Sequence, residues 1–91
     1  MSSVRVYVTT YCGFCHAAKR FLDVMGVPYE TIDVTTDHET RRWLVEQSGM
    51  RTVPQIFVGD TPIGGYDDML RLDAEGGLRP LLDEVGVSYA S

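Results

Sequence analysis

The sequence has no cluster of lysine or arginine: 8 basic side chains against 13 acidic ones give a formal net charge of −5. Affinity for a phosphate backbone requires clustered basic residues, so nucleic acid is excluded as an expected partner. No apolar run approaches the roughly 20 residues that a membrane-spanning helix needs. The first residues contain no apolar segment typical of a secretory signal. We therefore expect a cytoplasmic protein that does not interact with a membrane.

Cysteine is scarce as well: the chain has two, Cys12 and Cys15. In the cytosol such thiols are normally kept reduced. A disulfide between them would close a loop of four residues, which the loop-entropy model values at only ~2 kcal/mol, less than the ~3 kcal/mol of a fifteen-residue loop. The spacing thus favours a reactive pair over a structural crosslink.

The 44% of apolar residues follow a period of two in some segments and a helical period in others. Capping and turn residues mark the ends of these segments; Thr36 and Glu39, for example, match a capping box. We expect strands at 4–8, 29–34, 52–58 and 61–63, and helices at 14–25, 36–48, 68–75 and 78–85. This order predicts an α/β fold with a four-stranded mixed sheet flanked by helices on both faces. One domain should span residues 1–91, with a loose tail at residues 88–91.

Two details of the sheet follow from the turn residues. Gly59 and Asp60 form a two-residue hairpin turn, so the last two strands should be antiparallel. Pro62 has no backbone donor, which predicts that the last strand lies at an edge. The first strand–helix–strand unit should be parallel.

Cys12 and Cys15 fall where the first strand gives way to the first helix. The start of a helix offers free N–H groups and the positive end of the dipole, which stabilise a thiolate and lower the pKa of its thiol. Cys12 is therefore the expected nucleophile. Cys15, one turn later on the apolar side of the helix, is suited to resolve a mixed disulfide.

Three other interpretations of the cysteine pair are possible. Cys12, Cys15 and His16 match a haem-attachment pattern, which would require export and room for the haem. A closed zinc site would need four ligands, and only His16 and His38 could join the cysteines. Two inert core thiols are disfavoured because the turn at Gly13 exposes at least the first of them. A redox centre remains the favoured interpretation.

Three segments, taken together in this order and spacing, carry a resemblance to a known family. They are Tyr7 with Cys12-Gly13-Phe14-Cys15, then Thr52-Val53-Pro54, then Gly64-Gly65-Tyr66-Asp67-Asp68. From Val4 to Leu82 the chain resembles the glutaredoxins. Two cysteines are present and the Trp-Pro insertion of the monothiol class is absent, so the chain is most similar to the dithiol class, in particular to short bacterial glutaredoxins of the third type.

The resemblance implies a thioredoxin-like fold and a glutathione-dependent thiol–disulfide oxidoreductase, serving electron transport and cell redox homeostasis. Its expected partners are glutathione and disulfide-containing or glutathionylated proteins, and its expected state is a monomer. Cys12 would attack and Cys15 would resolve, while Pro54 would follow a cis peptide bond. The glutathione-binding residues implied are Phe14, Arg51, Thr52, Val53, Pro54, Gly65, Tyr66 and Asp67. Arg41 is a further candidate for the glycyl carboxylate, although it and Arg42 could be only a solvated helix face, and Asp67 could be only an N-cap.

The chain departs from the family pattern at the active site. Gly13-Phe14 replaces the common Pro-Tyr, Thr9 replaces a common lysine, and Tyr66 replaces a cysteine of some relatives. Because the resemblance suggests that proline at position 13 hinders cluster binding, Gly13 keeps an alternative open. In it, Cys12 from each of two protomers and two glutathiones hold a [2Fe–2S] cluster, and the chain then dimerises. The missing lysine keeps open another low-molecular-weight thiol, as in the related mycoredoxins.

Overall fold

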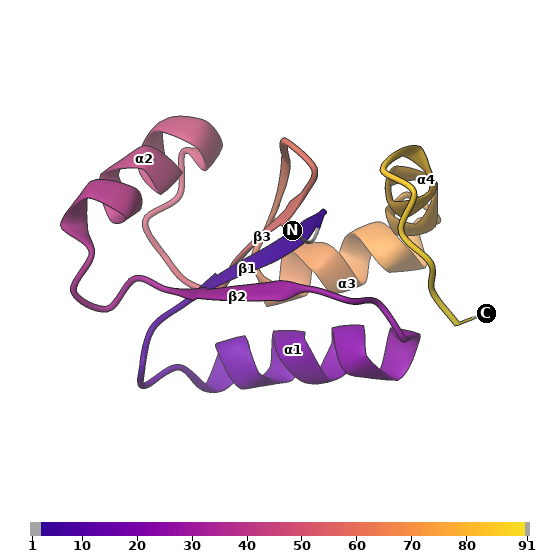
Figure 1. Ribbon diagram of the computed structural model, residues 1–91, viewed down its shortest axis with the longest axis horizontal. Helices are drawn as coiled ribbons and strands as arrows, with labels where there is room; N and C mark the ends of the chain where they lie inside the picture. The colour runs from indigo at the N-terminus through magenta and orange to yellow at the C-terminus, as the bar shows by residue number, and fades with distance from the viewer. Residues whose placement is uncertain (1–2, 91) are drawn as a thin grey trace.

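The computed structural model describes residues 3–90 and contains four strands and four helices in the order β-α-β-α-β-β-α-α (Figure 1). The expected elements are present and only their ends differ. They are β1 (Val4–Val8), α1 (Gly13–Met25), β2 (Glu30–Asp33), α2 (His38–Ser48), β3 (Gln55–Val58), β4 (Thr61–Gly64), α3 (Tyr66–Ala74) and α4 (Leu78–Glu84). Gly26 and Gly49 end α1 and α2, as expected.

The strands form one mixed sheet in the order β2-β1-β3-β4. β1 pairs with β2 in parallel and with β3 antiparallel, and β3 pairs antiparallel with β4. In this register Val6 lies beside Thr31 on one side and Ile56 on the other. Pro62 is on β4 at the edge of the sheet, which confirms the position predicted for it. The architecture is the expected thioredoxin-like fold.

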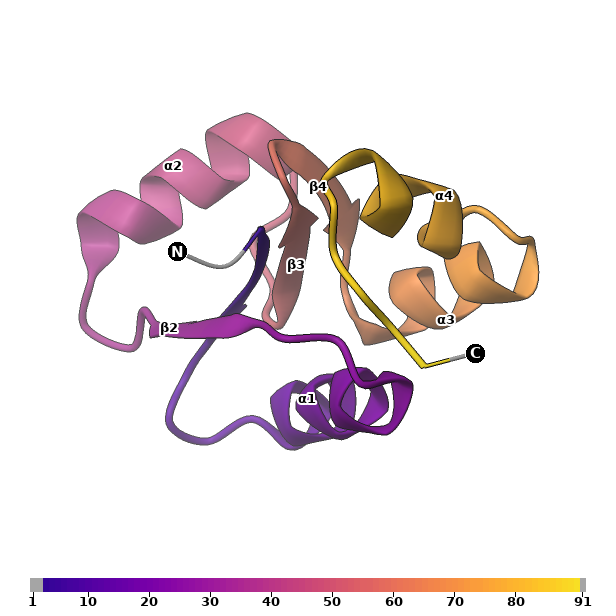
Figure 2. The same cartoon turned by 45° about the vertical axis from the view of Figure 1, so that its right-hand side comes forward.

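Side chains of the two central strands alternate between the faces of the sheet, so both faces are buried. On one face, valines of β1 and Ile56 of β3 pack with buried residues of three helices, namely Cys15, Ala18, Leu22 and Met25 of α1, Met69 of α3, and Leu78 and Leu82 of α4. On the other face, Tyr7 and Phe57 pack against Leu44 of α2. Figure 2 shows α1 on one side of the sheet and α2 on the other, so helices cover both faces as predicted.

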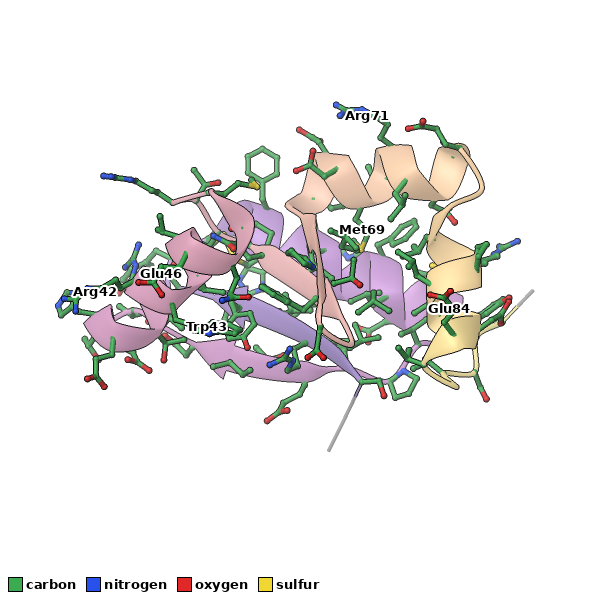
Figure 3. The ribbon with its side chains drawn as sticks, turned by 90° about the horizontal axis from the view of Figure 1, so that it is seen from above. Arg42, Trp43, Glu46, Met69, Arg71 and Glu84 are labelled. Atoms are coloured by element: carbon green, nitrogen blue, oxygen red, sulfur yellow. A yellow bond between two sulfur atoms is a disulfide. The ribbon has the colours of Figure 1, made fainter. Side chains whose placement is uncertain are left out.

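The face under α2 is built around aromatic rings. Phe57 lies against Trp43 with ring centroids 5.5 Å apart, and against Tyr7 at 5.4 Å. The guanidinium of Arg5 lies over the Phe57 ring and donates to the Tyr7 hydroxyl at 2.9 Å. In Figure 3, Trp43 turns toward the sheet, whereas Arg42 lies on the outer side of α2. This second core holds α2 on the sheet.

Two helix starts differ from the expected ones. The N-cap of α2 is Asp37, whose carboxylate accepts the Thr40 N–H at 3.0 Å, so the predicted cap at Thr36 is wrong by one residue. Hydrogen bonds from the Thr40 hydroxyl and backbone lower the pKa of Asp37. α3 begins at Tyr66, two residues earlier than expected, because Asp68 caps it from inside the first turn.

The tail expected to be loose is docked over residues 88–90. The N–H of Ala90 donates to the carbonyl of Met25 at the end of α1, and the Tyr89 ring packs on the core. The Tyr89 hydroxyl donates to the Asp83 carboxylate at 3.2 Å. Ser91, the last residue of the predicted tail, lies outside the described residues. Within residues 3–90, no helix has the length and apolar character needed to cross a membrane.

We predict that Phe57→Ala lowers the free energy of unfolding by about 3–5 kcal/mol, because it removes a ring that is 1% exposed and central to the aromatic core. Phe14→Ala is the matched control, since the Phe14 ring is 63% exposed, and it should change that free energy by no more than about 0.5 kcal/mol. Urea denaturation followed by circular dichroism measures both values. Equal losses in the two variants would contradict the account of the α2 face.

Candidate active site

Cys12 and Cys15 lie at the start of α1, directly after the loop that leaves β1. Cys12 is the N-cap, and its sulfur accepts the Cys15 N–H at 3.1 Å. The structure joins the two sulfurs in a disulfide, with the Cα atoms 5.2 Å apart. The sulfur of Cys12 therefore sits where a helix stabilises negative charge.

The two sulfurs differ in their access to solvent. Cys15 is 2% exposed and belongs to the core under α1, whereas Cys12 is half-buried. The carbonyl oxygen of Val53 approaches the Cys12 sulfur at 3.7 Å. A disulfide sulfur carries no proton, so this approach is a contact here and becomes a hydrogen bond only when Cys12 is a thiol. An incoming reagent thus reaches Cys12 before Cys15.

A groove of about 280 Å³ lies between the start of α1, the loop before β3 and the start of α3. Its lining comprises Phe14, Met50, Thr52, Val53, Pro54, Gly65, Tyr66, Asp67 and Asp68. The Val53–Pro54 peptide bond is cis, as the family resemblance implied. The Phe14 and Tyr66 rings face each other with centroids 6.3 Å apart. The structure thus gathers the predicted binding residues, except for Arg51, around one groove.

Arg51 lines a neighbouring hollow on the outer side of α2, together with Arg41, Arg42, Val45 and Glu46. Arg42 and Glu46 point outward there in Figure 3. Asp67 and Asp68 lie at the other end of the groove, on the first turn of α3. The groove is therefore flanked by positive charge on the α2 side and by negative charge on the α3 side.

The first turn of α3 is capped by Asp68. Its carboxylate accepts the Gly65 N–H at 2.8 Å, and Gly65 is the N-cap. Gly64 has φ +99°, and a Cβ on it would overlap the Asp68 carboxylate, so the turn requires glycine there. The alternative that Asp67 is the N-cap is wrong. The side chain of Asp67 is exposed and makes no hydrogen bond to another described residue.

Sequence reasoning missed Asp68 and Met50 as groove residues. Asp68 stands three positions after Gly65, the spacing of a capping-box carboxylate, and that signal could have identified it. Met50 precedes the recognised Thr52-Val53-Pro54 segment and carries no comparable signal. It reaches the groove because the chain turns back toward α1 before β3 begins.

The loop carrying Thr9, where many relatives have lysine, is fastened to the end of β2. The Thr10 N–H donates to the Thr35 hydroxyl oxygen at 2.8 Å, and the Thr35 hydroxyl donates to the Asp33 carboxylate at 2.6 Å. The Thr35 hydrogen bonds lower the pKa of Asp33. This arrangement places a carboxylate, not a lysine cation, behind the loop that leads to Cys12.

A thioredoxin-like fold with a Cys-x-x-Cys disulfide at the start of α1 defines a thiol–disulfide oxidoreductase. The family profile of Glutaredoxin matches residues 4–63. Glutaredoxin 3 of Escherichia coli (strain K12) is 42% identical over 82 residues, which cover 90% of this chain and 99% of that protein. A glutaredoxin of Neisseria meningitidis serogroup A is 42% identical over 84 residues, covering 91% and 99%. The chain belongs to the glutaredoxin family, whose members are glutathione-dependent thiol–disulfide oxidoreductases.

Solved structures agree with this assignment. The crystal structure of a buckwheat glutaredoxin–glutathione complex superposes with a TM-score of 0.84 at 34% identity, covering 93% of this chain and 80% of that one. The solution structure of glutaredoxin from Brucella melitensis gives a TM-score of 0.77 at 39% identity, covering 90% and 89%. The family comparisons favour an oxidoreductase over the cluster-binding alternative.

We predict that Asp68→Ala lowers the free energy of unfolding by about 1 kcal/mol more than Asp67→Ala does, because only Asp68 satisfies the Gly65 N–H. Both substitutions remove one negative charge from the same helix start, so the dipole contribution is common to them. Urea denaturation measures the difference. Equal stability of the two variants would show that Asp68 does not cap α3.

Proposed function

We propose that this protein uses glutathione to reduce protein–glutathione mixed disulfides and protein disulfides, with Cys12 as the nucleophile. The observation that carries the proposal is the position of the accessible Cys12 sulfur. It lies at a helix N-terminus, 3.7 Å from the carbonyl oxygen of Val53, a residue that also lines the groove. A ligand joined to Cys12 by a disulfide would therefore have its sulfur beside the groove and could extend into it. The glutathione complex of the buckwheat relative supports glutathione as the occupant.

In the proposed reaction, the Cys12 thiolate attacks the glutathione sulfur of a protein–glutathione disulfide. The Cys12–glutathione disulfide forms as the substrate protein leaves as a thiolate. The thiolate of a second glutathione then attacks the glutathione sulfur of this adduct, releasing glutathione disulfide and restoring the Cys12 thiolate. For a protein disulfide, Cys12 forms a mixed disulfide with the substrate, and Cys15 attacks the Cys12 sulfur, which releases the reduced protein and forms the Cys12–Cys15 disulfide. Two glutathiones then reduce this disulfide and leave as glutathione disulfide. The burial of Cys15 fits this second, internal step.

The groove suits the three parts of glutathione. The backbone of Val53, after Thr52 and before cis Pro54, would pair with the cysteinyl residue beside Cys12. Gly65 and Tyr66 at the start of α3 would receive the γ-glutamyl carboxylate, because helix N-termini bind anions. Asp67, whose carboxylate is exposed, would pair with the γ-glutamyl amino group.

The arginines beside α2 would receive the other end of the ligand. Arg51, and Arg41 beside it, would bind the glycyl carboxylate, which requires their side chains to reach from the neighbouring hollow. Phe14 would cover the ligand from the start of α1. These assignments use one chain throughout, so we propose a monomer, working in the cytoplasm, where glutathione keeps thiols reduced.

We predict that Cys12→Ser abolishes reduction of a glutathionylated peptide, because no thiolate remains to accept the glutathione sulfur. Cys15→Ser should retain that activity and lose reduction of a protein disulfide, because the mixed disulfide can no longer be resolved internally. Peptide release measured by mass spectrometry and insulin reduction measured by turbidity report the two reactions. Activity retained in Cys12→Ser would exclude Cys12 as the nucleophile.

We predict faster turnover with glutathione than with mycothiol, because only glutathione carries both the γ-glutamyl and glycyl carboxylates. Arg51→Met should raise the KM for glutathione about fivefold, the value of an exposed ion pair of ~1 kcal/mol. For the wild type, the KM for glutathione monoethyl ester, whose glycyl carboxylate is blocked, should exceed the KM for glutathione. The difference should be smaller for Arg51→Met, in which only Arg41 can still contact that carboxylate. Arg79→Met, an exposed arginine on α4, serves as the control. Preference for mycothiol would overturn the choice of thiol.

A further inference from the structure

Gln55 is the one buried polar side chain among residues 3–90, with 2% of its surface exposed. It is the first residue of β3, directly after cis Pro54, and does not line the groove. Its Nε2 donates to the carbonyl of Met50 at 2.8 Å and to that of Thr52 at 3.0 Å. Its Oε1 lies 2.8 Å from the hydroxyl oxygen of Ser48, whose single hydrogen is shared between this oxygen and the Leu44 carbonyl, also at 2.8 Å. Each hydrogen bond of the carboxamide thus reaches the end of α2 or the loop that precedes β3.

The chemistry of these partners fixes the orientation of the carboxamide. Two carbonyl oxygens require two N–H donors, and the hydroxyl can donate to the remaining oxygen. Rotating the amide by half a turn would place Oε1 against both carbonyls. The Ser48 oxygen also accepts the Met50 N–H at 3.1 Å, so the network includes the first turn of the loop. No described buried side-chain nitrogen or oxygen lacks a partner.

This network determines which way the loop carbonyls point. The Thr52 carbonyl turns inward to Gln55, whereas the next carbonyl, that of Val53, lies 3.7 Å from the Cys12 sulfur. These two carbonyls belong to adjacent residues in the bend that precedes β3. A change that releases the Thr52 carbonyl from Gln55 therefore also disturbs the Val53 carbonyl beside Cys12.

We infer that Gln55 is a positioning residue: from behind the groove, its carboxamide sets the backbone of residues 50–53 in the conformation that receives the cysteinyl part of glutathione. The inference rests on the proposed function, since it concerns the same groove. It assigns Gln55 no contact with glutathione. A contribution of Gln55 to stability alone would affect every adduct of Cys12 equally. A role in ligand selection would affect the glutathione adduct more than others.

The test is an exchange equilibrium in the Cys15→Ser background, where Cys12 holds one adduct at a time. The Cys12–glutathione disulfide reacts with 2-mercaptoethanol to give the Cys12–mercaptoethanol disulfide and free glutathione. Mass spectrometry gives the ratio of the two adducts at known thiol concentrations. Both adducts share the Cys12 sulfur and the same fold, so a general loss of stability cancels from this ratio. Only glutathione has peptide groups that could bind the loop.

We expect Gln55→Met, which keeps the size and removes the hydrogen bonds, to shift the exchange constant about tenfold toward the mercaptoethanol adduct. Gln47→Met is the matched control, because Gln47 is exposed on α2, and it should leave the constant unchanged. Ser48→Ala removes one partner of the carboxamide and should shift the exchange constant about threefold in the same direction. If Gln55→Met does not fold, Ser48→Ala takes its place in the test.

Exchange constants that stay at the wild-type value in Gln55→Met, or in Ser48→Ala where it replaces that variant, would overturn the inference while leaving the proposed function intact. A wild-type domain with no preference for glutathione over 2-mercaptoethanol would overturn the proposed function instead, and the role of Gln55 with it. The two failures are distinguishable because the first is seen only in the variants and the second already in the parent.

Discussion

Burial of both faces of β1 and β3 is the constraint on which the rest of the structure depends. With apolar side chains alternating to both sides, the sheet needs helices on both faces. The strand directions then determine where the active site forms. β1 ends where antiparallel β3 begins, and β4, antiparallel to β3, ends there too. The start of α1, the loop before β3 and the start of α3 consequently meet at one end of the central strands.

At this end of the strands, two helix starts and one loop surround the sulfur of Cys12. Cys12 occupies the N-cap of α1 and Gly65 occupies the N-cap of α3. Val53 lines the same groove as Gly65, and its carbonyl oxygen lies 3.7 Å from the Cys12 sulfur. Two helix N-termini favour negative charge at this end of the strands, although the formal net charge of the chain is −5. Local geometry, not net charge, would therefore account for the binding of the proposed anionic ligand. With Thr9 in place of a lysine, this proposed role would fall to the helix N-termini and to the arginines near α2.

Much of this arrangement could be predicted from the sequence, because it depends on local patterns. Strand β1 and the end of α1 follow from period and from Gly26, and the cis bond before Pro54 followed from the family resemblance. The starts of α2 and α3 were misplaced by one or two residues within local capping patterns. The larger errors lie where a contact distant in sequence decides the structure. β3 begins at Gln55, not at position 52, because the preceding residues turn toward α1, and residues 88–90 are held by the end of α1. Apolar periodicity carries no information about such contacts.

The site itself was predicted unevenly, and the unevenness has a physical cause. Most of the residues predicted from the sequence line the groove. Asp68, which also lines it, and Gln55, which does not, were missed, and both act through hydrogen bonds to the backbone. Asp68 holds the Gly65 N–H at the start of α3, and Gln55 holds the Thr52 carbonyl before cis Pro54. Each fixes a backbone segment while neighbouring peptide groups face the groove. Because every residue has a peptide group, a ligand recognised through the backbone places little constraint on the identity of the residues that contact it. The specificity of such a site depends on the side chains that shape its backbone, and these are best identified by asking where each buried polar atom finds its partner.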